Sequence, residues 1–75
     1  MKDYNSVTKH IFVFKSIHDV IRSERIIKDL KIIYQIVPVP SIINSECGMC
    51  IEIDNDFVNQ VDNELNRLDI FHKIY

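Results

Sequence analysis

Both cysteines and the only glycine of the chain fall in one short stretch, Cys47-Gly48-Met49-Cys50. Thiolates are the nucleophiles and soft metal ligands of proteins, so this stretch is where chemistry is to be sought. A glycine tolerates backbone angles and close approaches that other residues resist, and the single one here stands between two thiols. Pro38 and Pro40 precede it and favour a stiff, extended entry into the loop.

Several kinds of chemistry are open to the two cysteines. As a nucleophile or a carrier of a sulfur atom, Cys47 needs exposure, a thiolate form and an open approach, which Gly48 supplies. A redox pair would require a Cys47–Cys50 disulfide, but such pairs work well when the first cysteine begins a helix, and Cys50 falls in a predicted strand. Zinc could add His18 and His72 to the two thiols, although a second Cys pair or a spaced His pair is missing. Both thiols could also be small apolar fillers. We expect a reactive Cys47 and a filler role for Cys50.

The three histidines are the side chains whose charge changes near neutral pH. His18 falls in the first turn of a predicted helix, where it either orients a thiolate or points into water, and the sequence favours neither. We expect His10 and His72 to be solvent-exposed. Asp54 and Asp56 are most simply explained as helix caps.

Size and composition bound what the chain can be. Its 75 residues predict one domain, 1–75, with a flexible tail at 1–9, and a core of this size is marginal without a metal, a disulfide or a partner subunit. Hydrophobic residues at 47% and charged residues at 27% are typical of a globular protein. Because the core is marginal, we expect that the protein could form a homodimer.

Charge and hydropathy exclude some classes of protein. The formal net charge is −2, so the basic face of a nucleic-acid binder is missing. No apolar block resembles a signal peptide, and none approaches the roughly 20 residues that cross a bilayer. We expect a cytoplasmic protein without a membrane partner, in which cysteines are not structural staples.

The hydrophobic pattern predicts four strands and two helices. Strands are expected at 10–15, 32–37, 49–53 and 71–75, and helices at about 17–30 and 57–68, the first one capped by Ser16. Its apolar stripe contains Ile17, Val20, Ile27 and Leu30, with Ile21 and Ile26 at the edges. Ser23 is interpreted as a small residue that allows close helix-to-sheet contact, and Glu24 as a rim or tethered residue.

The order β-α-β-β-α-β predicts a ferredoxin-like α+β fold, with a four-stranded antiparallel sheet in the order 4-1-3-2 and both helices on one face. Cys47, Ser16 and His18 are then expected at one edge of the domain, where the helix N-terminus would lower the pKa of the thiol. The other face of the sheet would carry either Ile11 and Val13 or Phe12 and Phe14. Pairing of that face with a second copy or another protein is an alternative function.

Four segments resemble a family of very small bacterial proteins described as selenium/sulfur carrier-like. They are Phe14 with Ser16-Ile17-His18-Asp19, then Ser23-Glu24-Arg25-Ile26-Ile27-Lys28, then Ile36-Val37-Pro38-Val39-Pro40, and Ser45-Glu46-Cys47-Gly48-Met49. The resemblance spans about His10 to Ile70. It implies a carrier of sulfur or selenium on Cys47, the position that matches the family's Cys-Gly, working with donor and acceptor proteins. Ser41, where a basic residue is expected, and Cys50, where a small or apolar one is expected, depart from the family pattern.

These observations lead to one functional hypothesis and its alternatives. We expect a carrier without a cofactor and without turnover of its own, whose Cys47 holds a persulfide or perselenide. His18 and the Ser16-capped helix end would stabilise the anion, and Gly48 would admit a partner thiol. The alternatives are a binding module that dimerises through the open sheet face, and a metal-binding or redox protein using Cys47 and Cys50.

Overall fold

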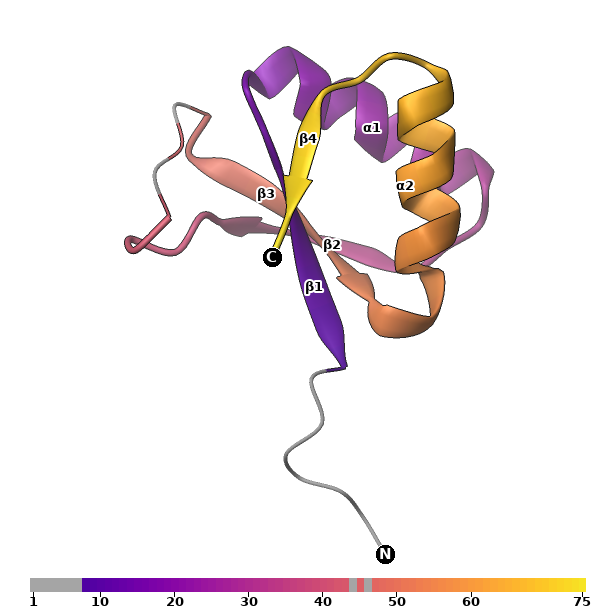
Figure 1. Ribbon diagram of the computed structural model, residues 1–75, viewed down its shortest axis with the longest axis horizontal. Helices are drawn as coiled ribbons and strands as arrows, with labels where there is room; N and C mark the ends of the chain where they lie inside the picture. Colours follow the sequence, from indigo (N-terminus) through magenta and orange to yellow (C-terminus); the bar gives the residue numbers. More distant parts are fainter. Residues whose placement is uncertain (1–7, 44, 46) are drawn as a thin grey trace, which may run out of the picture.

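The computed structural model describes residues 8–43, 45 and 47–75, and it shows a four-stranded antiparallel sheet with both helices against one face (Figure 1). The elements are β1 (Lys9–Phe14), α1 (Ile17–Asp29), β2 (Tyr34–Pro38), β3 (Met49–Asp54), a 3₁₀ turn (Asn55–Phe57), α2 (Val58–Arg67) and β4 (His72–Ile74). The strand order β2-β3-β1-β4 is the predicted order 4-1-3-2 read from the other edge. The predicted fold is confirmed.

The predicted ends of the elements lie within two residues of the observed ones. Most of the predicted tail, residues 1–7, lies outside the described residues, and Lys9, which we assigned to the tail, already pairs with Asp54 as the first residue of β1. No helix among the described residues is long and apolar enough to cross a membrane.

Both helices end in the same way. Lys31 and Asp69 follow the C-caps with φ of 60° and 61°. The next residue, Ile32 or Ile70, donates its N–H to the carbonyl of Ile27 or Leu65. This is the Schellman arrangement, here without the usual glycine. Because Ile32 and Ile70 are both buried, each helix end is also anchored in the core, and Ile32 is not part of β2, where we expected it.

The sheet face that packs on the helices carries the aromatic residues of β1. Phe12 is opposite Ile51 in the register, and both are fully buried in the core cluster. Ile11 and Val13 therefore lie on the other face. The sequence left this choice open.

The apolar stripe of α1 lies where it was predicted, with Val20 and Ile27 buried and Leu30 packed against the core, except in the first turn. The buried residues are Val20, Ser23 and Ile27, while Ile17 and Ile21 are 49% and 47% exposed. Ser23 is fully buried, as the close-contact interpretation requires, so the helix packs through this small residue and its stripe is centred there. The placement of Ile17 in the buried stripe was wrong.

Glu24, the polar residue beside that stripe, is tethered. The hydroxyl of Tyr34 donates to its Oε2 atom at 2.6 Å, which connects α1 to β2. The hydrogen bond to this carboxylate raises the pKa of Tyr34, with smaller contributions from burial and from the carboxylate charge.

His72 is buried, and our expectation of exposure was wrong. Its side chain is 3% exposed. Nε2 lies 2.6 Å from Oδ1 of Asp62 on α2, and Nδ1 lies 2.7 Å from the carbonyl oxygen of Ile70. The ring also lies 5.5 Å from that of Phe12 between centroids. Because β4 alternates, its first residue points to the helices, where a polar ring needs partners.

His72 should therefore be a stability determinant. We expect His72→Ala to lower the free energy of unfolding by roughly 2–4 kcal/mol, because it leaves a cavity beside Phe12 and removes the shorter of two hydrogen bonds to Asp62. The exposed His18 provides the control, since His18→Ala should change stability by less than about 0.5 kcal/mol. Urea unfolding of the two variants measures the difference, and equal midpoints would contradict the assignment.

Candidate functional site

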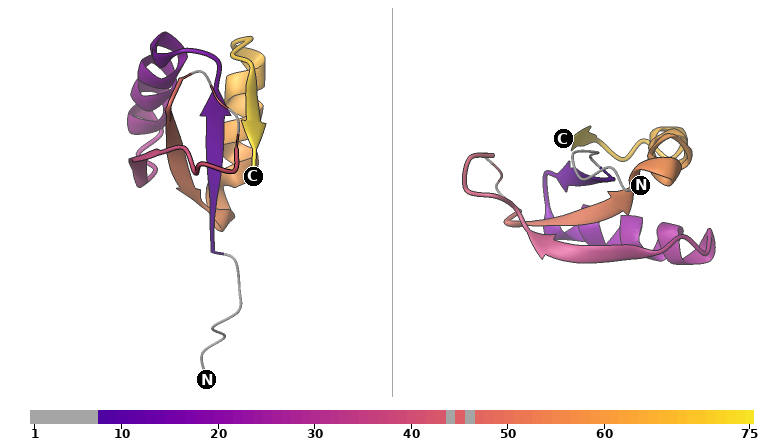
Figure 2. Two further views of the ribbon diagram at one scale, coloured as in Figure 1. Left: turned by 90° about the vertical axis from the view of Figure 1, so that its left-hand side faces the viewer. Right: turned by 90° about the horizontal axis from the view of Figure 1, so that it is seen from below.

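The connection between β2 and β3 lies over the sheet face that the helices leave open (Figure 2). Pro38 ends β2, and the N–H of Val39 donates to the carbonyl of Gly48 at 3.0 Å, which closes the base of the loop. The N–H of Ile43 donates to the carbonyl of Pro40 at 2.9 Å and makes a turn. The two ends of the loop thus lie side by side at the end of the sheet, and Cys47 is in the end that leads into β3.

Cys47 is a half-buried free thiol. It packs against the core cluster, and its backbone N–H donates to Oγ of Ser45 at 3.2 Å. Glu46, between these residues, lies outside the described residues. The backbone of Cys47 is therefore held by its own loop, while part of the residue stays accessible to solvent.

Gly48 is required for its backbone conformation. Its φ is +82°, in the left-handed region that disfavours residues with a Cβ. A Cβ built there would meet no atom of the described residues within 4 Å, and the residue is exposed. The glycine is therefore needed for its backbone angle and not for want of space.

Cys50 has the opposite environment. It is fully buried within β3, between Val37 and Val13 of the neighbouring strands, and its Sγ lies 3.8 Å from the carbonyl oxygen of Pro38. Burial, followed by the negative charges of Glu52 and Cys47, raises the pKa of this thiol. At a given pH, Cys50 thus has less thiolate than an ordinary cysteine.

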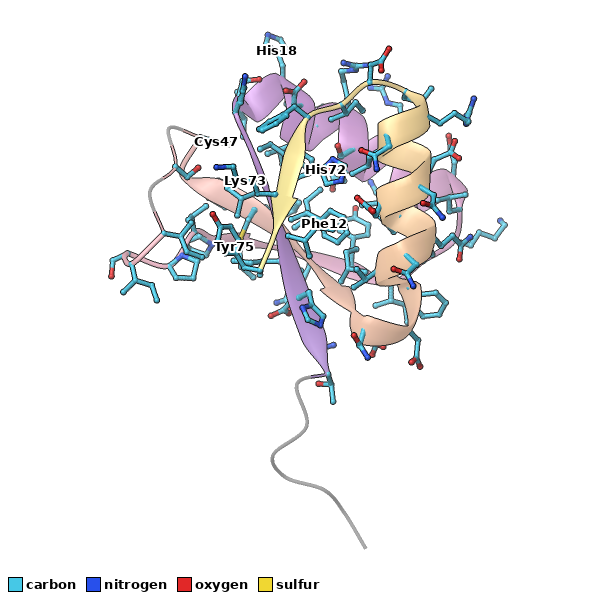
Figure 3. The ribbon with its side chains drawn as sticks, viewed as in Figure 1. Phe12, His18, Cys47, His72, Lys73 and Tyr75 are labelled. Carbon is cyan, nitrogen blue, oxygen red and sulfur yellow. The ribbon has the colours of Figure 1, made fainter. Side chains whose placement is uncertain are left out.

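Ser16 and His18 lie at the start of α1. Oγ of Ser16 accepts a hydrogen bond from the N–H of Asp19 at 3.3 Å and caps the helix. His18 is exposed, and Figure 3 shows its side chain pointing outward from α1, away from Cys47. The end of β1, the start of α1 and the start of β3 lie toward one edge of the sheet (Figure 1). The role of His18 as a partner of the thiolate stays a prediction.

Within the residues that the structure describes, no three His, Cys, Asp or Glu side chains are placed to hold a metal ion. Both cysteines are free. His10, instead of joining a cluster, contacts Oδ1 of Asn55 and the carbonyl oxygen of Tyr75 through its two ring nitrogens, at 3.0 and 3.1 Å.

Comparison with protein families decides the classification. A family model described as "Putative Se/S carrier protein-like" matches residues 9–74. The chain belongs to this family. The match runs from the first residue of β1 to the last of β4, so it includes every helix and strand described for this Se/S carrier-like chain. Searches of curated proteins and of solved structures give no significant match.

Sequence reasoning missed two polar features of this Se/S carrier-like fold. One is the contact between the buried side chain of His72 and the half-buried Asp62. The other is a pair of lysines, Lys15 and Lys73, that line a pocket on the open face. Strand alternation would have separated His72 from Lys73, but nothing local to β4 indicates which of the two faces is covered.

Gly48→Ala tests the backbone role of the glycine. We expect a loss of about 1 kcal/mol in the free energy of unfolding, because alanine disfavours a φ of +82° even though it has space. Met49→Ala, at the next residue, is the control. It shows the effect of any substitution in this segment, because it should leave the backbone angles of residue 48 unchanged. NMR chemical shifts report the loop conformation, and urea unfolding measures the stability. A Gly48→Ala protein with unchanged stability and shifts would contradict this role.

The two thiols should react at different rates. We expect Cys47 to be alkylated by iodoacetamide in the native protein, whereas Cys50 should react at least tenfold more slowly, because it is buried and its pKa is raised. Because the raised pKa means that Cys50 forms its thiolate only at higher pH, the difference between the two alkylation rates should narrow only when the pH is well above the ordinary pKa of a thiol. Mass spectrometry of peptides, with the denatured protein as the control, measures both rates. Equal native rates would refute the distinction.

Proposed function

We propose that the protein carries sulfur or selenium on Cys47, as a persulfide or perselenide, and passes it to a partner protein. The observation that carries the proposal is the contrast between the two thiols of a Se/S carrier-like chain: Cys47 is half-buried and followed by an exposed glycine, and Cys50 is fully buried with a raised pKa. A carrier atom must be reached by two different partners in turn. Only Cys47 meets that requirement.

The chemistry needs little from the protein. The Cys47 thiolate attacks the outer sulfur of a donor persulfide, a new S–S bond forms to Cys47, and the donor thiolate leaves with its electron pair. An acceptor thiolate then attacks the outer sulfur, and Cys47 leaves as the thiolate. No external oxidant or reductant is consumed, and the protein acts as a carrier without a turnover of its own.

Each neighbouring residue has a proposed part in this exchange. Gly48 leaves the approach to Cys47 open. The Ser16-capped end of α1 and, after rotation of its side chain, His18 would stabilise the anionic sulfur. The donor and acceptor are thiol proteins, and the proposed setting is the cytoplasm, where thiols stay reduced.

The alternative of assembly through the open sheet face is less well supported. Ile11 and Val13 do lie on that face. Val13, however, is only 7% exposed, and the β2–β3 loop lies over the same face (Figure 2). The surface left for a second copy is correspondingly reduced, so the carrier role is the function we favour.

Loading the protein tests the carrier role. After incubation with a cysteine desulfurase and cysteine, we expect intact mass spectrometry to show a gain of one sulfur atom that a reductant removes. Cys47→Ser should lose the gain, and Cys50→Ala should retain it. The same experiment with a selenocysteine lyase and selenocysteine tests the selenium cargo. A Cys47→Ser protein that still gains sulfur would exclude Cys47 as the carrier.

A further inference from the structure

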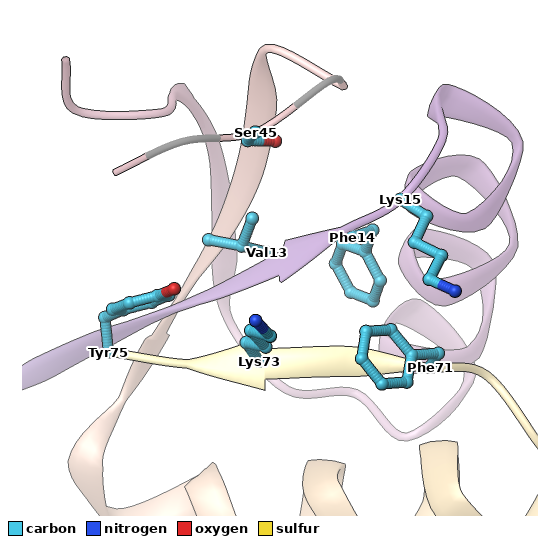
Figure 4. A pocket seen from close by; sticks show the side chains of 7 residues that line it. All are labelled: Val13, Phe14, Lys15, Ser45, Phe71, Lys73 and Tyr75. Carbon is cyan, nitrogen blue, oxygen red and sulfur yellow. The ribbon is translucent and has the colours of Figure 1, made fainter. Parts of the chain in front are cut away.

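A pocket of about 520 Å³ lies on the open face of the sheet, against β1 and β4 (Figure 4). Its size is that of a site for a small organic molecule. The residues that line it are Val13, Phe14, Lys15, Ser45, Phe71, Lys73 and Tyr75. Cys47 is not among them, so the pocket is distinct from the proposed carrier site.

The register of β4 explains why this pocket is both aromatic and basic. Lys73 is opposite Val13, and the backbone groups of Tyr75 and Ile11 exchange two hydrogen bonds at 3.0 and 3.2 Å. Alternate residues of a strand share a face, so Phe71, Lys73 and Tyr75 all project onto the open face. Figure 4 shows them in a row along β4.

Among the residues that the structure describes, the charged side chains that line the pocket are both positive. They are Lys15 and Lys73, and none of the described lining residues is Asp or Glu. The salt bridges between described residues involve other cations, namely Arg22, Arg67 and His72. Two lysines thus face one cavity in a chain whose formal net charge is −2.

Two contacts prearrange the polar groups. Nζ of Lys15 lies 4.7 Å from the centroid of the Phe71 ring, a cation–π contact that holds the ammonium at the pocket wall and leaves its N–H groups free to donate. Oγ of Ser45 accepts from the N–H of Cys47, so the hydrogen of this hydroxyl is available to another acceptor.

We propose that this pocket binds a small aromatic anion, a flat ring that carries a phosphate or a carboxylate. The oxyanion lies between the ammonium groups of Lys15 and Lys73 and accepts a hydrogen bond from Ser45. The ring packs on Tyr75 and Val13. Charge-assisted hydrogen bonds orient the anion, and burial of the ring contributes the apolar part of the affinity. The proposal does not depend on the carrier role of Cys47.

Titration followed by amide NMR shifts tests the proposal on the full chain. Phenyl phosphate and benzoate are the probes, and inorganic phosphate and phenol supply the anion and the ring alone. We expect saturable shifts around the pocket with at least one probe, at a Kd roughly tenfold below that of its separate parts, and weaker binding in high salt. The tighter probe identifies the type of oxyanion. Absence of saturation with both probes, or equal binding of inorganic phosphate or phenol, would overturn the proposal.

Lysine variants test the geometry. Lys73→Gln and Lys15→Gln should each weaken probe binding about tenfold, and Lys73→Arg should keep it within about threefold, because the positive charge is retained. Lys28→Gln is the matched control, since Lys28 is an exposed lysine of the last turn of α1 and does not line the pocket. Binding that survives both Lys15→Gln and Lys73→Gln unchanged, or that falls equally with Lys28→Gln, would refute the site.

Discussion

The antiparallel pairing of β1 with β3 at the centre of the sheet is the constraint on which the rest of the structure depends. It places Phe12 opposite Ile51 on the face that packs on the helices, and Val13 opposite Cys50 on the other face. Because the two strands run in opposite directions, β3 begins where β1 ends and α1 starts. Cys47, two residues before β3, is brought to this edge by strand pairing.

The same pairing gives two cysteines, three residues apart, different chemistry. Cys50 belongs to the strand, where its neighbours bury it, and an isolated buried thiol resists ionisation. Cys47 precedes the strand, in a loop whose backbone turns at Gly48 with a positive φ. Burial and the raised pKa of Cys50 therefore mark it as a structural thiol, and the half-buried Cys47 is the candidate carrier thiol.

Alternation along β4 creates a second division of roles. His72 and Ile74 point toward the helices, and the imidazole of His72 is paired with Asp62 of α2. Lys73, between them, faces the open side and lines the pocket with Lys15. One short edge strand thus contributes to core stability on one face and to a basic, aromatic cavity on the other.

The sequence by itself determined the order and type of the elements, the cap at Ser16 and the small contact residue Ser23, because these depend on local periodicity and side-chain chemistry. Its motifs also indicated the family. Alternation predicts two sets of side chains in a strand, but only packing decides which set is covered, so the burial of His72 was missed. Helical period predicts a stripe, and Val20 and Ile27 are buried as predicted, but only packing decides how far along the helix the stripe is covered, so the exposure of Ile17 in the first turn was missed. The position of the β2–β3 loop over the open face depends on contacts between distant residues, and only the tertiary structure decided it.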